Sequence, residues 1–238
     1  MSRHCPGFRV LCVALLLSLA NGVFGSISPG NLKKIVKYIT DYGIENNHYA
    51  VAVRLDAKYC QDPTLTNLQT ALPKSVMSKM HEAIKKKNGI YVPNPIGNVV
   101  AARPNFKVQG FEHAEWRLLT GGQNSPTAKI LENKPRDSCL IFFSKLSPCT
   151  DRCLNPNDMR NFVQWLNPLF NQVGKDSRAF VFETFYGKDS DKEPAVVVAA
   201  WQTIKHAPLF RCDANNADCI QCFDNNDKVD PRCLAKQA

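Results

Sequence analysis

The fold is easiest to interpret at residues 139–153, which read CLIFFSKLSPCTDRC. The run from Cys139 to Phe143 is apolar without alternation, which is typical of a strand buried on both faces of a sheet. A Pro-Cys pair follows, and Cys149 and Cys153 lie four residues apart. Because that spacing is about one helical turn, both sulfur atoms can face one point. The stretch therefore predicts a buried strand that leads into a helix carrying two thiols.

Strands and helices alternate on both sides of this stretch, according to the spacing of the apolar residues. We expect a helix that opens at Ser28-Pro29 and carries an apolar stripe as far as Ile39. Further helices are expected at 73–87, 112–119, 158–170 and 194–206, and strands at 48–56, 99–102 and 178–186. This alternation predicts an α/β sandwich with a partly parallel sheet. From Cys212 onward the chain is polar and holds four cysteines, which indicates a disulfide-stapled tail and no second domain.

The first 25 residues have the features of a secretory signal peptide. Arg3 and Arg9 precede an apolar run at 10–20, and small residues follow as far as Gly25. The run is shorter than the roughly 20 apolar residues that a membrane-spanning helix needs. We therefore expect cleavage after Gly25 and a secreted, extracellular protein that does not enter a membrane.

The composition is that of an ordinary globular chain. Of its 238 residues 44% are hydrophobic and 21% are charged, which excludes a wholly disordered, collagenous or coiled-coil protein. The formal charge is +9, and removal of Arg3 and Arg9 with the signal peptide, which takes no acid, leaves +7. This charge suits a polyanionic substrate, although the basic residues are spread along the chain.

A catalytic metal site is predicted from His113, Cys149 and Cys153. Zinc accepts imidazole and thiolate ligands, and its catalytic sites use three protein ligands and leave a fourth position for water. The segment that begins with His113 and the segment that begins with Cys149 each open a predicted helix. The dipole at the N-terminus of a helix favours thiolates. Glu115 lies two residues after His113, where a carboxylate can move a proton from the water to a ring nitrogen and a leaving amine. We expect one zinc ion per chain, with Glu115 as the proton shuttle of a hydrolytic base deaminase.

The motifs His113-Ala-Glu115 and Ser147-Pro148-Cys149 resemble those of the zinc-dependent cytidine deaminase superfamily. Within it the chain is most similar to the AID/APOBEC-like branch, and its signal peptide suggests the secreted novel AID/APOBEC-like deaminases. The similar pattern covers roughly residues 95–212. Three features depart from it. Leu146 stands where the family has a tryptophan, and the cysteine pair is one residue wider than the commonest C-x-x-C. The helix at 73–87 is an insertion between the first two strands.

The resemblance implies a cytidine-deaminase-like, three-layer α/β/α sandwich with a mixed, partly parallel, five-stranded sheet. It divides the chain into a signal peptide (1–25), a deaminase domain (26–211) and the stapled tail (212–238). The implied reaction converts cytosine to uracil in single-stranded DNA or RNA. Two alternatives stay open: a deaminase of free cytidine or deoxycytidine, and an extracellular defence protein that only binds nucleic acid. The sequence does not indicate an oligomeric state.

The resemblance also implies which residues contact the substrate. Ser147 and Pro148 belong to the motif at the metal, and Asn98 takes the place of an asparagine that touches the sugar. Phe185 and Tyr186 lie in the loop after the fourth main strand, which reads the neighbouring nucleotide in the family. Both aromatic residues are equally compatible with a place in the core.

The sequence gives no reason to assign four further polar residues to a functional site. His48, His81 and His206 have no companion ligands, and Asp189 lies in an acidic stretch typical of a loop. We therefore expect all four side chains to be solvated.

Eight cysteines remain after Cys5 and Cys12 are removed with the signal peptide, and export favours disulfides. Two are assigned to zinc, although a bridge between Cys149 and Cys153 stays possible. The six disulfide candidates are Cys60, Cys139, Cys212, Cys219, Cys222 and Cys233. Six cysteines allow fifteen pairings, and Cys60 and Cys139 can bridge each other or the tail. A second zinc site in the tail is not favoured, because no histidine accompanies its cysteines.

Overall fold

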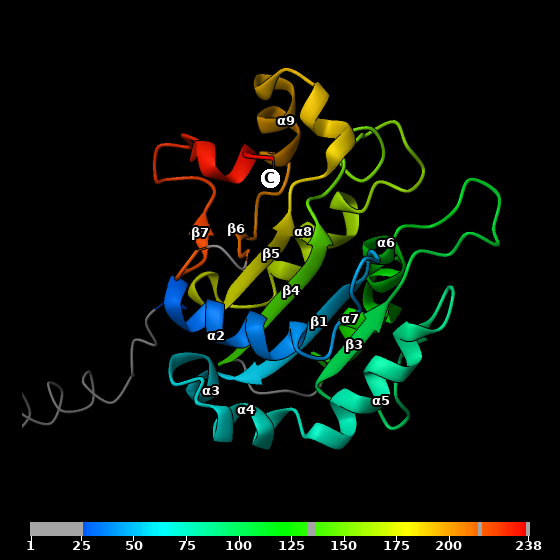
Figure 1. Cartoon of the computed structure of the whole chain (residues 1–238), viewed down its shortest axis with the longest axis vertical. Helices are drawn as coiled ribbons and strands as arrows, with labels where there is room; N and C mark the ends of the chain where they lie inside the picture. Colours follow the sequence, from blue (N-terminus) through cyan, green and yellow to red (C-terminus); the bar gives the residue numbers. More distant parts are fainter. Residues whose placement is uncertain (1–25, 133–136, 214–215, 237–238) are drawn as a thin grey trace, which may run out of the picture.

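A computed structural model describes residues 26–132, 137–213 and 216–236 (Figure 1). The predicted signal peptide lies outside the described residues. A mixed sheet with the strand order β2-β3-β1-β4-β5-β6-β7 forms the centre of the molecule. The strands are β1 (Ala50–Asp56), β2 (Ile90–Tyr91), β3 (Val99–Ala102), β4 (Ser138–Leu146), β5 (Arg178–Thr184), β6 (Leu209–Arg211) and β7 (Ile220–Gln221).

The strand directions bring several chain segments to one edge of the sheet. β1 is antiparallel to both of its neighbours, β3 and β4, whereas β4, β5 and β6 run parallel. Ala50, at the start of β1, pairs with Ala102 at the end of β3 and with Ser144 near the end of β4. We call this the carboxyl edge, and the arrows of β4 and β5 point toward it in Figure 1. Loops after β3, β4 and β5 and the loop before β1 therefore meet there.

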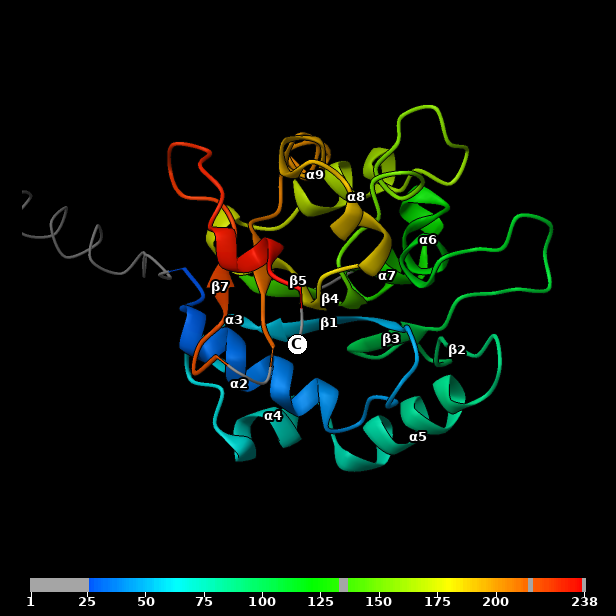
Figure 2. The ribbon, with the colours of Figure 1, turned by 45° about the horizontal axis from the view of Figure 1, so that its top comes forward.

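Helices cover both faces of the sheet, which gives three layers (Figure 2). One face carries α2 (Pro29–Thr40), α3 (Ala57–Gln61), α4 (Leu65–Ala71) and α5 (Lys74–Lys85). The other carries α6 (Ala114–Leu119), α7 (Pro126–Lys129), α8 (Val163–Phe170) and α9 (Pro194–Trp201). Short 3-10 helices are η1 (Gly122–Asn124), η2 (Lys175–Ser177), η3 (Gly187–Asp191) and η4 (Pro231–Leu234). The predicted three-layer α/β/α sandwich with a mixed sheet is confirmed.

The central strand β4 supplies side chains to both cores. Phe142 packs into the core under α6 to α9, and the next residue, Phe143, packs into the core under α2 to α5. Neither ring is exposed to solvent. The uninterrupted apolar run was therefore a correct sign of a strand buried on both faces.

The sheet differs from the expectation in its strand number, which is seven and not five. One extra strand of two residues lies at each lateral side of the sheet, β2 beside β3 and β7 beside β6. Two residues are too few to show alternation, so the sequence pattern could not reveal them. Through β7 the cysteine-rich tail continues the sheet.

Helix α8 begins later than the spacing of apolar residues predicts. Residues 155–161 form turns instead, in which Asp158 Oδ1 accepts from Arg160 N at 2.7 Å. Asn161 Oδ1 accepts from Val163 N, also at 2.7 Å, and so satisfies the first backbone N–H of the helix. Met159, which has the helical spacing, is 86% exposed. Local hydrogen bonds from Asp and Asn side chains therefore replace the first turns of the predicted helix.

Three disulfides form among the six cysteines predicted to bridge, and they connect Cys60 with Cys139, Cys212 with Cys219, and Cys222 with Cys233. The first joins α3 to the start of β4. The other two lie within the tail. Among the residues that the structure describes, no helix has the length and apolar character needed to cross a membrane.

Candidate metal centre

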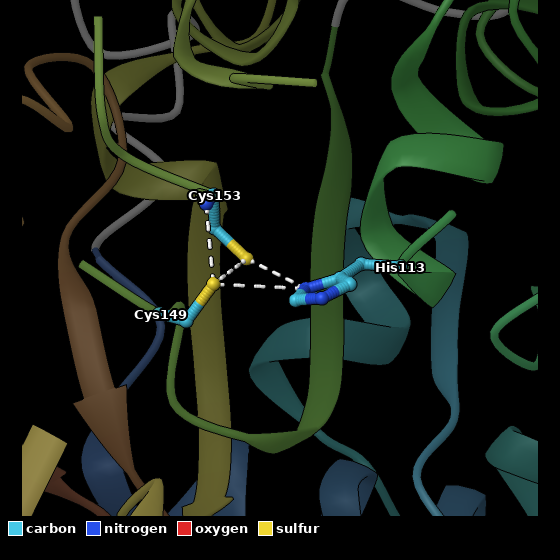
Figure 3. A group of neighbouring side chains, drawn as sticks. All are labelled: His113, Cys149 and Cys153. Carbon is cyan, nitrogen blue, oxygen red and sulfur yellow. Dashed lines mark hydrogen bonds between the residues drawn. The ribbon is translucent and has the colours of Figure 1, made fainter. Parts of the chain in front are cut away.

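Three side chains from two segments meet at the carboxyl edge of the sheet (Figure 3). His113 is the N-cap residue of α6, and Cys149 and Cys153 follow β4. Nδ1 of His113 lies 3.0 Å from Cys153 Sγ and 3.7 Å from Cys149 Sγ. The two sulfurs are 2.7 Å apart and are not joined in a disulfide. The structure thus brings together the three predicted ligands, whose donor atoms all lie within 4.8 Å of one another.

The two cysteines lie in a turn, and the helix predicted for them does not form. Leu154 N donates to Cys149 O at 3.1 Å, and Cys153 N donates to Cys149 Sγ at 3.2 Å. Asn155 precedes Pro156, a position that disfavours helical backbone and so stops the turn from continuing. The turn still directs both sulfurs to one point, but a single backbone N–H takes the place of the helix dipole that we expected to favour a thiolate.

A buried carboxylate holds this turn from the side. Asp189 accepts from Thr150 N at 2.9 Å and from Thr150 Oγ1 at 2.7 Å. It also pairs with Lys192 Nζ at 3.2 Å. Only 1% of Asp189 is exposed, so the expectation of a solvated loop residue is wrong. Asp189 fixes the residue directly after Cys149, which the sequence stretch alone could not indicate.

The thiols of the turn have different proton affinities. The hydrogen bond with Cys153 lowers the pKa of Cys149 to about 5, and this bond together with His113 outweighs the opposing effect of burial. Burial raises the pKa of Cys153, and the neighbouring Cys149 raises it further. One thiolate is therefore favoured even without a metal ion. A set of one half-buried imidazole and two buried thiols, one of them ionised, fits the soft donors that zinc takes in catalytic sites.

Glu115 lies beside these donors with its carboxylate almost fully buried, at 1% exposure. Oε1 accepts from Ser144 Oγ at 2.6 Å, and Oε2 lies 3.2 Å from His48 Nε2. Burial by itself would raise the pKa of Glu115, but His48, the charge of His113 and the bond from Ser144 lower it to about 2. The carboxylate is therefore ionised and oriented, as a group that accepts a proton must be.

His48 is the site residue that sequence reasoning missed. Its side chain is 16% exposed and contacts Glu115, so the expectation that His48 is a solvated surface residue is wrong. The residue lies two positions before β1, which begins at the carboxyl edge because it is antiparallel to β3 and β4. A prediction of that strand direction would have been the signal needed to place His48 at the site.

The segments expected to contact the substrate lie at the ends of β4 and β5. Ser147 and Pro148 are both buried. Ser147 N donates to Thr184 O at 2.8 Å, and Ser147 Oγ accepts from Tyr186 N at 3.0 Å. The motif thus fastens the two strand ends together, next to the thiols.

Two aromatic residues after β5 have different environments. Phe185 is only 7% exposed and packs edge-on against Trp201, with ring centroids 5.8 Å apart, so it belongs to the core. Tyr186 is half-buried beside the candidate metal ligands, and burial together with the negative charge of Cys149 raises its pKa. Of the two residues, only Tyr186 has surface left for a substrate.

Asn98 is not brought to the site, and the expectation of a sugar contact is wrong for this residue. Its Nδ2 donates to Ala71 O at 3.1 Å, and its Oδ1 accepts from Arg54 Nη1 at 3.4 Å. Asn98 precedes β3, which runs toward the carboxyl edge, so Asn98 lies at the opposite edge of the sheet. Asn105, which follows β3, is the asparagine on the side of the metal centre.

A comparison with protein families agrees with this geometry. A family model described as Secreted Novel AID/APOBEC-like Deaminase 1 matches residues 29–237, a range that includes the three donor residues and Glu115. No curated protein and no solved structure matches the chain.

Proposed function

The chain belongs to the Secreted Novel AID/APOBEC-like Deaminase 1 family, and from that premise we propose a secreted zinc deaminase that converts cytosine to uracil in single-stranded DNA or RNA. The observation that carries the proposal is a buried, ionised Glu115 beside three soft donor atoms. A purely structural metal site needs no such carboxylate. A protein that only binds nucleic acid needs neither the buried carboxylate nor the three donor atoms.

His113, Cys149 and Cys153 would hold one zinc ion. Two sulfur donors and one imidazole nitrogen leave a position for water, as in catalytic zinc sites. Zinc in such a site supplies a water whose pKa is lowered to about 7, and so a strong nucleophile at neutral pH.

The proton movements are assigned to Glu115. Deamination adds water across the C4–N3 bond of cytosine and then breaks the C4–N4 bond, so that ammonia leaves and a carbonyl forms. Glu115 accepts a proton from the attacking water, delivers it to N3, and passes the second proton to the leaving amine. Ser144 and His48 hold the carboxylate in place for both transfers.

Single-stranded nucleic acid is the proposed substrate because a base must leave its stack to reach a buried metal centre. The formal charge of +7 that remains after removal of the signal peptide favours a polyanion. The half-buried Tyr186 provides an aromatic surface next to the ligands.

Secretion is supported by three independent features. The N-terminal 25 residues have the pattern of a signal peptide. Three disulfides are typical of an oxidising compartment. The name of the family also describes secreted proteins. Expression of the full chain in secreting cells should deliver the protein to the medium with residue 26 at its N-terminus.

The central experiment combines metal analysis with an activity assay. We expect one zinc per chain and uracil formation on cytidine-containing single strands, with cytidine and deoxycytidine assayed in parallel. Glu115→Gln should lower turnover by roughly 10²- to 10⁴-fold, the usual contribution of a proton-transfer group, while zinc content stays unchanged. Glu193→Gln, an exposed carboxylate before α9, is the matched control. Unchanged uracil formation by Glu115→Gln would contradict the mechanism, and turnover of nucleosides alone would contradict the substrate.

A further inference from the structure

A row of three aromatic rings leads from the metal centre toward solvent along the loop between β3 and α6. The ring of His113 stacks on Phe111, with centroids 5.0 Å apart and planes inclined by 22°. Phe111 stacks in turn on Phe106, with ring centroids 5.6 Å apart and planes inclined by 30°. In Figure 2 this loop projects from the sheet between β3 and α6. The row begins at a metal ligand and ends at Phe106.

Phe106, the outermost ring, is 58% exposed. It is the only aromatic residue among the large hydrophobic side chains left exposed in the described ranges. Full burial of a phenylalanine side chain stabilises a protein by about 1.5–3 kcal/mol. Because its side chain is largely exposed, Phe106 contributes only part of this free energy. Its position is nevertheless fixed, since its backbone N donates to Asn88 Oδ1 at 3.0 Å. The molecule thus holds a flat apolar surface in solvent, two rings away from the metal ligand.

Two arginines from the metal-binding segment hold the loop in place. Arg152, between the two cysteines, lies 4.5 Å over the ring of Phe111 and donates to the backbone carbonyl of Gly110. Arg160 donates to Gly110 O and to Gln109 O, both at 2.7 Å. Because both rings are held before any ligand arrives, little conformational entropy is lost when a flat group stacks on them.

The surroundings of the row are positively charged. Arg103, Arg117 and Arg160 donate to backbone carbonyls and an asparagine, and among the described residues none of them forms an ion pair with a carboxylate. Lys107, next to Phe106, is exposed. Glu112 is the only acidic residue between positions 103 and 112. Part of this charge is neutralised, because Asp158 pairs with Arg152 at 3.4 Å and Glu112 interacts with Arg117. An aromatic surface beside basic side chains is the usual combination in proteins that bind single strands.

We propose that Phe106 is a stacking platform for an unpaired base next to the target base in the same strand, with Phe111 and Arg152 as its support. The inference rests on the proposed function, since it names how that substrate is held. It also assigns part of the recognition of neighbouring bases to the loop after β3, because Phe185, expected to take part, is in the core.

The test measures binding separately from catalysis. A fluorescently labelled single-stranded DNA with one cytidine among thymidines, and its RNA counterpart, are titrated with zinc-loaded full chain carrying Glu115→Gln. Stacking of a base on an aromatic ring predicts a roughly 5- to 150-fold loss of affinity for Phe106→Ala. Phe106→Leu keeps an apolar contact with Phe111 but removes the flat aromatic face. We therefore expect this variant to lose as much affinity as Phe106→Ala. Phe106→Trp should retain the affinity, and Leu65→Ala, at another exposed apolar residue, should leave it unchanged.

Activity assays with Glu115 intact complete the test. Phe106→Ala should raise KM for the oligonucleotide by a similar factor and leave KM for free cytidine unaltered. Affinity within twofold of the parent for Phe106→Ala would overturn the proposal, and so would full affinity in Phe106→Leu or a parent that binds neither strand. If the Phe106 variants lose affinity but nothing is deaminated by the parent, the platform stands and the proposed function fails.

Discussion

Glu115 depends on two residues that are distant from it in the sequence. Ser144 reaches it from the central strand β4, and His48 reaches it from the loop before β1. A buried carboxylate with only one of these contacts would be free to rotate and would cost more to keep ionised. The two contacts together hold the charge and fix the direction in which the carboxylate takes its proton.

His48→Ala should lower turnover while sparing zinc and fold. Loss of a hydrogen bond to a charged group costs about 1.5–3 kcal/mol, so kcat should fall roughly 10- to 150-fold, with KM for the oligonucleotide nearly unchanged. His48→Gln, which retains an amide donor, should recover part of the rate. His206→Ala, a half-buried histidine outside the site, is the control. Equal activity of His48→Ala and the parent would exclude a positioning role for His48.

At the scale of residues, the sequence was informative where function depends on local spacing. His113 and Glu115 lie two positions apart and Cys149 and Cys153 four, so each pair meets through one short segment. His48 could not be found in this way, because its contact with Glu115 depends on the direction of β1. Asn98 was assigned wrongly for the same reason, since its distance from His113 does not reveal at which end of β3 it lies.

At the scale of elements, the metal turn is fastened to the rest of the carboxyl edge by side chains and not by helical structure. Asp189, in the 3-10 helix η3, binds Thr150, and Arg152 binds the loop that precedes α6. The prediction of a helix at 149–153 used the correct spacing, but spacing alone does not distinguish a helical turn from a turn closed by a thiol and a carboxylate. Strands β2 and β7 were not predicted, because two residues are too few to show the alternation of apolar and polar side chains that indicates a strand.

Asp189→Asn tests this anchoring. The amide keeps an acceptor for Thr150 but removes the charge that faces Lys192 in a buried position. We expect a loss of unfolding free energy of about 1–3 kcal/mol and a roughly tenfold weaker hold on zinc, measured by competition with a chelator. Asp191→Asn is the matched control, because its side chain is 81% exposed. If both variants release zinc alike, the turn does not depend on Asp189.

At the scale of the whole molecule, the bridge between Cys60 and Cys139 lies at the opposite end of β4 from the two cysteines that could hold a metal ion. Cys139 is at the start of β4, whereas Cys149 and Cys153 follow the end of the same strand. The pairing of Cys60 with Cys139 was one of the alternatives left open by the sequence. The choice required the fold, which places α3 beside the first residues of β4. One oxidised framework and one reduced site can therefore occupy the same chain.

The bridges should differ in their effect on stability. Cys60 and Cys139 are 79 residues apart in the sequence, whereas Cys212 and Cys219 are 7 apart. A cross-link that closes a longer loop removes more entropy from the unfolded chain, about 4–5 kcal/mol for the first and about 2–3 kcal/mol for the second. Urea denaturation of Cys60→Ala/Cys139→Ala should therefore show the larger loss of unfolding free energy. Cys212→Ala/Cys219→Ala is the matched comparison, and both variants should keep their zinc because neither removes a candidate ligand or Glu115. A greater loss in the short-loop variant would mean that native packing around the tail, and not the entropy of the unfolded chain, determines what these bridges contribute.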